Sequence, residues 1–391
     1  MAVLAEDWQS GGFGLYIHWP FCQAKCPYCD FNSHVAAKID QQRWLAAYLA
    51  EISRVGAETP GRVLDTVFFG GGTPSMMQPE IVHAILDMVR ATWRCSNSFE
   101  VTLEANPTSV EAGRFRGYRD AGVNRISMGI QSLNDADLRA LGRLHTAAEA
   151  RSAFDVARNT FDRISFDLIY ARQNQTISEW RAELQEALGM AADHLSLYQL
   201  TIEDGTAFGD RYRRGKLAGL PQDDDAADMY FATQEICEQA GLPAYEISNH
   251  AKPGSESRHN LIYWKYGDYI GIGPGAHGRI TLGGQRLATD TALQPGKWLA
   301  DVETRGSGEL NRELLLPTEQ LSEYILMGLR IGQGIDLTRA ERLMPNGIKD
   351  SNINHLIGLG LIDRADNRLF ATDQGRPILN SVIEALLPDS I

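Results

Sequence analysis

Short apolar stretches alternate with longer amphipathic stretches from residue 14 to about residue 200. The short stretches are rich in β-branched and aromatic residues, which predicts buried strands. The longer ones repeat their apolar side chains at helical spacing, as in Ile39–Val55. Repeated strand–helix units predict a parallel sheet, and about six units suit an open, partial (β/α)6 barrel of the TIM type. The predicted strands are Gly14–His18, Thr66–Phe69, Phe99–Glu104, Arg125–Gly129, Ile164–Ile169 and His194–Leu200.

The pattern changes near residue 312. Three helical stretches, Glu319–Leu329, Leu337–Leu343 and Ile353–Leu359, precede two short strands within Leu361–Ala371. This order is typical of a winged-helix-like module. We therefore predict two domains, a barrel over residues 1–311 and a small domain over residues 312–391. The small domain carries more acidic than basic residues, which favours a docking role over DNA binding.

Composition narrows the function classes. The chain has 391 residues, 43% of them hydrophobic, and a formal net charge of −13, which argues against nucleic-acid binding. No apolar run approaches the roughly 18 residues of a membrane span, and residues 1–12 lack a signal-peptide pattern, so we expect a cytoplasmic protein with no integral membrane segment. One basic cluster surrounds Tyr212. It is a solvated loop or a site for an anion such as a carboxylate-bearing porphyrin; its members are Arg211, Arg213, Arg214 and Lys216.

Three closely spaced cysteines, Cys22, Cys26 and Cys29, follow the first predicted strand. An odd number of thiols in so tight a loop cannot close into disulfides, so the spacing indicates a metal centre. An iron–sulfur cluster held by three thiolates leaves one iron open to a ligand. A closed zinc site with His34 as the fourth ligand is the alternative.

Further polar and glycine residues follow the other predicted strands. The carboxyl ends of parallel strands share one edge of a sheet, where ligands bind in such folds. Convergence of these residues with the cysteines at one rim therefore predicts a binding site rather than a set of separate turns. The residues are Gly70 to Pro74, Glu104 to Pro107, Gln131 and Asp167.

The segment Tyr16 to Cys22, together with Cys26, Tyr28 and Cys29, resembles the radical S-adenosylmethionine enzymes of the oxygen-independent coproporphyrinogen III oxidase family. The resemblance extends over nearly the whole chain. It implies a [4Fe–4S] cluster held by the three cysteines, with S-adenosylmethionine chelated at the open iron. It further implies cofactor contacts from Tyr16, Tyr28, Gly71, Gly72, Thr73 and Glu104, and a second ligand pocket around Gln131, Arg143 and Asp167.

Two positions point to one branch of that family. The oxidases carry a further cysteine where this chain has Phe31, and His259 to Trp264 resembles the His-Asn-x-x-Tyr-Trp signature of the HemW haem chaperones. The resemblance implies haem binding, with a histidine that can ligate iron, an amide that can orient it and two aromatic faces for the porphyrin. Without the resemblance, the residues themselves favour a core histidine, bonded to backbone beside an aromatic pair, over a haem ligand. The four residues are His259, Asn260, Tyr263 and Trp264.

The resemblance implies a haem chaperone that carries a cluster, S-adenosylmethionine and haem and transfers haem to apo-haemoproteins, including clients at a membrane surface. Two alternatives stay open: an oxygen-independent coproporphyrinogen III oxidase and a zinc-stabilised winged-helix regulator. The sequence departs from the family pattern in one loop, where Ala171–Asn174 replaces the usual Gly-Leu-Pro-Gly. The resemblance therefore does not predict the backbone path of this loop.

Overall fold

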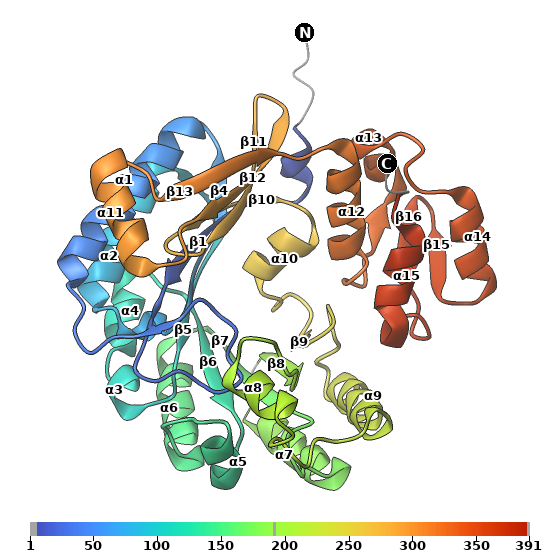
Figure 1. Cartoon of the computed structure of the whole chain (residues 1–391), viewed down its shortest axis with the longest axis horizontal. Helices are drawn as coiled ribbons and strands as arrows, with labels where there is room; N and C mark the ends of the chain where they lie inside the picture. The colour runs from blue at the N-terminus through green and yellow to red at the C-terminus, as the bar shows by residue number, and fades with distance from the viewer. Residues whose placement is uncertain (1–5, 191–192, 389–391) are drawn as a thin grey trace.

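An eleven-stranded sheet dominates the protein (Figure 1), whose computed structural model describes residues 6–190 and 193–388. The strand order is β13-β12-β11-β10-β1-β4-β5-β6-β7-β8-β9. The six predicted strands are confirmed as its parallel centre. They are β1 (Phe13–Trp19), β4 (Val63–Gly71), β5 (Arg94–Ala105), β6 (Arg125–Gln131), β7 (Arg163–Tyr170) and β8 (His194–Gln199).

Helices follow these strands and cover the outer face of the curved sheet (Figure 1). In α1, the predicted apolar face is buried through Trp44, Tyr48 and Ile52, and Asp40 caps the first turn by accepting a bond from the Arg43 amide. The helices of the barrel are α1 (Gln41–Glu58), α2 (Pro79–Thr92), α3 (Ser109–Ala112), α4 (Phe115–Ala121), α5 (Asp135–Ala140), α6 (Ala147–Thr160), α7 (Ile177–Gly189), α8 (Ala207–Arg213), α9 (Asp223–Gln239), α10 (Arg258–Trp264) and α11 (Pro295–Arg305).

The sheet extends beyond the predicted six strands on both sides. On one side β10 pairs in parallel with β1, and β11, β12 and β13 continue the sheet antiparallel; on the other, β9 pairs antiparallel with β8. The added strands are β9 (Asn249–Ala251), β10 (Asp268–Ile272), β11 (His277–Leu282), β12 (Gln285–Thr291) and β13 (Glu309–Leu314).

The C-terminal module has its own apolar core, which includes Leu321, Leu356 and Val382. The three predicted helices and two strands are present, and the structure adds β14 and a final helix, α15. In Figure 1 the module lies beside the open edge of the barrel, next to α10. Its elements are α12 (Pro317–Gly328), β14 (Ile335–Asp336), α13 (Leu337–Leu343), α14 (Asp350–Gly358), β15 (Ile362–Ala365), β16 (Arg368–Ala371) and α15 (Leu379–Leu386).

The loop that departs from the family pattern is fixed by Arg172. Its guanidinium is buried and pairs with Asp137 at 2.8 Å and with Glu183 at 2.7 Å. Ala171 and Asn174 adopt left-handed backbone conformations, with φ of 56° and 58°. Where the family pattern supplies glycines for this turn, an arginine with two carboxylate partners holds the chain in place.

Candidate functional site

The three cysteines lie together at the carboxyl end of β1. The chain leaves β1, forms the short strand β2 (Phe21–Cys22), and returns as β3 (His34–Val35), which pairs in parallel with β2. The cysteines all line one cavity of about 150 Å³, here named the cysteine cavity. Of the residues expected at the cluster, at S-adenosylmethionine and at the second ligand pocket, all but Tyr16 line it: Cys22, Cys26, Tyr28, Cys29, Gly71, Gly72, Thr73, Glu104, Gln131, Arg143 and Asp167.

Donors from two other loops, one after β4 and one between α5 and α6, point at two of the sulfur atoms. The Thr73 hydroxyl donates to Cys22 Sγ at 3.4 Å, and the Arg143 guanidinium donates to Cys26 Sγ at 3.4 Å. Such donors stabilise thiolates, the form that binds iron. The Nε atom of Arg143 is buried without a hydrogen-bond partner among the described residues. An unsatisfied cationic donor in a polar cavity fits a bound anionic or carboxylate-bearing group.

The glycines after β4 allow two loops to touch. A Cβ atom at Gly72 would lie 2.7 Å from the carbonyl oxygen of Phe21, and the Gly72 amide donates to Trp19 O at 2.7 Å. Gly71 has a φ of 110°, which side-chain-bearing residues rarely adopt. The missing side chain at Gly72 therefore serves contact with the cysteine loop as well as any approach of a ligand.

Two carboxyl groups meet across the cavity. Burial raises the pKa of Glu104 to about 8, and the nearby Asp167 adds to the rise. Burial likewise raises the pKa of Asp167 to about 6. The Gly71 amide donates to Glu104 at 3.2 Å. A ligand with a positive charge, such as an amino group, would lower both pKa values and so favour the ionised form of each carboxyl.

The second predicted ligand pocket is part of the same cavity. Arg143 donates to Asn106 Oδ1 at 2.6 Å and to the Gly129 carbonyl at 2.7 Å, so it crosses the ends of β5 and β6. Gln131 has a φ of 74°, a conformation that a residue other than glycine rarely adopts. Strained backbone at the end of a central strand is typical of a binding site.

A larger cavity of about 450 Å³ adjoins the first, here named the aromatic cavity. Phe31, Gly71 and Glu104 line both cavities. Tyr263 and Trp264 of the signature segment lie in its wall, as does Tyr16. Sequence analysis missed the rest of the wall: His18, Asn32, Tyr266, Gly267, Tyr269, Gly275, Ala276, His277, Arg279, Arg286, Glu323 and Met327.

His259 is buried behind this wall and does not line the cavity. Its Nδ1 atom is 2.7 Å from the Thr66 hydroxyl and its Nε2 atom is 2.6 Å from the Tyr263 hydroxyl. Burial, and the charge of Arg125 to a smaller extent, lower the pKa of His259 to about 3. Ligation of haem iron by this ring stays a prediction, and it would require the ring to give up one of these two bonds.

Two other sequence observations have clear structural positions. The Tyr212 cluster lies on and just after α8, where Arg213 pairs with Asp210 at 2.5 Å and both side chains are exposed.

His34, the fourth ligand of the zinc alternative, has its Nε2 atom 3.0 Å from Asn32 Oδ1. No three His, Cys, Asp or Glu side chains among the described residues converge to hold a single metal ion. A four-iron cluster differs, because its thiolates bind separate irons.

Comparison with known proteins decides the family. Residues 16–187 match the model of the Radical SAM superfamily, and residues 315–378 match the HemN C-terminal domain. The chain is 36% identical over 387 residues to the Heme chaperone HemW of Haemophilus influenzae, covering 96% of this chain and 98% of that protein. It belongs to the HemW family of radical SAM proteins.

Other relatives of this HemW family member extend the comparison. Radical S-adenosyl methionine domain-containing protein 1, mitochondrial, from Danio rerio is 37% identical over 384 residues, covering 95% of this chain and 86% of that protein. Coproporphyrinogen III oxidase (HemN) from Escherichia coli matches with a TM-score of 0.80 at 20% identity, covering 96% of this chain and 89% of that one. At that identity the match shows the fold, a HemN-like barrel with a small C-terminal domain.

Proposed function

We propose that this protein binds haem and passes it to apo-haemoproteins. The observation that carries the proposal is the aromatic cavity, which has the volume of a small-molecule site and shares a wall with the cysteine cavity. Rings from Tyr263, Trp264 and Phe31 offer flat apolar surface for a porphyrin. The HemW family membership supports the same ligand.

A [4Fe–4S] cluster on Cys22, Cys26 and Cys29 is the second part of the proposal. A cluster with three protein ligands supplies an open iron that can chelate the amino and carboxylate groups of S-adenosylmethionine. Glu104 and the Thr73 hydroxyl lie in the same cavity to orient the cofactor. Arg143, Asp167 and Gln131 line the same cavity, where a second ligand would contact them.

The signature segment has two roles in this proposal. Tyr263 and Trp264 contact the porphyrin, while His259 holds the Tyr263 hydroxyl from behind. Asn260 lies on the first turn of α10, where the Ser257 hydroxyl accepts a bond from its amide. His277 is exposed and lines the aromatic cavity, so it offers haem iron an imidazole that His259, behind the wall, does not present there.

Phe31 favours the chaperone over the oxidase. In the position of the oxidase's extra cysteine, this chain presents a phenyl ring that is 60% exposed and lines both cavities. We therefore propose haem binding without decarboxylation of coproporphyrinogen III. The zinc-stabilised regulator is not favoured, because His34 is engaged by Asn32 and the family match includes all three cysteines.

The partners are haem and apo-haemoproteins, with no nucleic acid. No helix in the described ranges is long and apolar enough to cross a membrane, so contact with a membrane haemoprotein would be peripheral. A cytoplasmic location is part of the proposal. The name of the Danio rerio relative places that protein in mitochondria.

Anaerobic reconstitution followed by haem titration tests the function. We expect one saturable change in haem absorption and then transfer of haem to apomyoglobin on mixing. An anaerobic assay with reductant, S-adenosylmethionine and coproporphyrinogen III should give no protoporphyrinogen. Catalytic formation of that product would establish the oxidase instead, and haem that binds but reaches no acceptor would indicate storage or sensing.

A further inference from the structure

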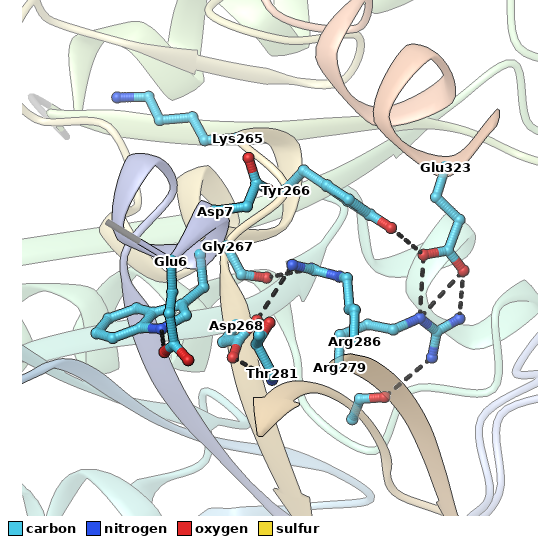
Figure 2. A network of polar contacts seen from close by, with 12 residues as sticks. Glu6, Asp7, Lys265, Tyr266, Gly267, Asp268, Arg279, Thr281, Arg286 and Glu323 are labelled. Carbon is cyan, nitrogen blue, oxygen red and sulfur yellow. Dashed lines mark hydrogen bonds and ion pairs between the residues drawn. The ribbon is translucent and has the colours of Figure 1, made fainter. Parts of the chain in front are cut away.

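An arginine and a glutamate from different domains meet in the wall of the aromatic cavity. Arg279 on β11 donates to Glu323 on α12 through Nη2 at 2.7 Å and through Nε at 3.0 Å (Figure 2). The Tyr266 hydroxyl donates to the same carboxylate at 3.1 Å. Glu323 therefore has three donors, all from the barrel, although it belongs to the C-terminal module.

The pair is open to the cavity rather than sealed inside the interface. The Arg279 side chain is 23% exposed and the Glu323 side chain is 25% exposed, and both line the cavity. Partly solvated ion pairs contribute little net stability, so another carboxylate can replace one partner at small cost. Arginine's planar fork fits any carboxylate in the same two-point manner.

A second arginine strengthens the positive potential of this wall. Arg286 is 3% exposed, lies 3.7 Å from the centre of the Tyr266 ring, and donates to Asp268 at 3.1 Å. Asp268 is shared, because Arg62 donates to it as well at 2.8 Å. The Nε atom of Arg286 has no partner among the described residues. Arg62 has a second carboxylate partner, Glu6, at 3.8 Å, so it is the unpartnered Nε atom of Arg286 that leaves this wall able to attract a further anion.

The pair also connects the two domains. In the described residues, two ion pairs join the module to the rest of the chain: Arg279 with Glu323, and Arg339 of α13 with Asp7. The pair of Arg339 with Asp7 lies outside the cavity. It can therefore keep the module attached to the barrel while a ligand carboxylate replaces Glu323 at Arg279.

We propose that Arg279 is the carboxylate-binding residue of the aromatic cavity and that Glu323 occupies this subsite until a ligand carboxylate replaces it. The inference rests on the proposed function, and it identifies the propionate groups of haem as the part of the ligand that Arg279 recognises. On binding, a propionate takes the two donors of Arg279, and Glu323 turns to water. Ligand entry thereby releases one of two ionic links between the module and the barrel, which couples haem loading to the position of α12.

Two variants of the same ion pair test the inference. Arg279→Gln and Glu323→Gln both abolish the pair, so a purely structural role predicts effects in the same direction. The proposal predicts opposite directions. Arg279→Gln should weaken haem binding about tenfold or more, because the propionate loses a charged donor. Glu323→Gln should tighten it about two- to fivefold, because the internal competitor is gone.

The experiment titrates the full-length protein with haem and with haem dimethyl ester, whose propionates carry no charge. Wild type should prefer haem, Arg279→Gln should lose the preference, and Arg279→Lys should keep part of it. Glu303→Gln is the matched control, because Arg43 holds Glu303 through two bonds far from the cavity. Hydrogen exchange of α12 should rise when haem is added and not when the ester is added.

The outcomes separate the inference from the function it rests on. Equal binding of haem and ester by wild type, or weaker haem binding in both variants, overturns the carboxylate subsite while haem binding stands. Absence of any saturable haem binding by wild type overturns the proposed function and the subsite with it. Circular dichroism spectra identify a variant that has not folded, and Arg279→Lys, which keeps the charge, then carries the comparison.

Discussion

The two cavities share Phe31, Gly71 and Glu104, yet they are built in different ways. The cysteine cavity is formed by loops that follow successive parallel strands, β1 and β4 to β7. The aromatic cavity takes its wall from β1, α10, the strands β10 to β12, which extend the sheet beyond β1, and α12 of the other domain.

The difference in construction separates two kinds of chemistry. The cysteine cavity presents thiols, carboxyls and a half-buried arginine on the ends of parallel strands and on the loops beside them, which suits a fixed cofactor. The aromatic cavity presents rings and an exchangeable ion pair across a domain boundary, which suits a ligand that must enter and leave.

The largest expected effect is loss of the cluster. Cys22→Ser, Cys26→Ser or Cys29→Ser should each abolish it, because a hydroxyl is a poor ligand for these irons. Reconstituted wild type should hold about four irons and four sulfides per chain, measured by chemical analysis. Cys95→Ser, at a half-buried thiol outside the cavity, should keep the cluster. Stoichiometric zinc in anaerobically isolated protein, with no uptake of iron and sulfide, would contradict the assignment.

Glu104 provides the next test, since it lies in both walls. Glu104→Gln keeps the shape and removes the charge, so S-adenosylmethionine should perturb the spectrum of the reduced cluster with an affinity at least about tenfold lower. Electron paramagnetic resonance during a titration measures this. Glu303→Gln should match wild type. An unchanged affinity in Glu104→Gln would mean that the cofactor does not contact this carboxyl.

The raised pKa of Glu104, about 8, also predicts a pH dependence of stability. Between roughly pH 4.5 and pH 8 the unfolded chain has released a proton that the folded protein retains, so the free energy of unfolding falls as pH rises. In cofactor-free Glu104→Gln, the fall between pH 5 and pH 8.5 should be smaller by roughly 4 kcal/mol, measured by urea unfolding. An identical pH profile in the variant and wild type would place the titration on another group.

The smallest effect separates the two roles of His259. If the ring acts by holding Tyr263, Tyr263→Phe should weaken haem binding about fivefold, as expected for one lost hydrogen bond, and His259→Ala should weaken it at least as much. Cluster absorption should survive in both. Loss of the ligand-type haem spectrum in His259→Ala alone, restored by added imidazole, would instead show that this histidine ligates the iron.

Much of the cysteine cavity could be predicted because parallel topology determines where strand ends lie. Once Gly70–Pro74, Glu104 and Asp167 are placed after strands, the sheet brings them to one rim whatever the helices do. Local sequence could not show that Gly72 packs on the Phe21 backbone. Nor could it show that Arg172 fixes the loop Ala171–Asn174 through its carboxylate partners. Both depend on contacts between segments that are far apart in the sequence.

The amino-acid sequence by itself determined the parallel barrel, the cysteine motif, the winged-helix-like module and the family to which they belong. These depend on periodicity and short motifs, which are local properties of the chain. Only the tertiary structure decided that His259 lies behind the cavity, that His277, Arg279 and Arg286 line it, and that Glu323 reaches it from the other domain. Those positions follow from strand pairing and domain docking across long stretches of chain, which no local pattern encodes.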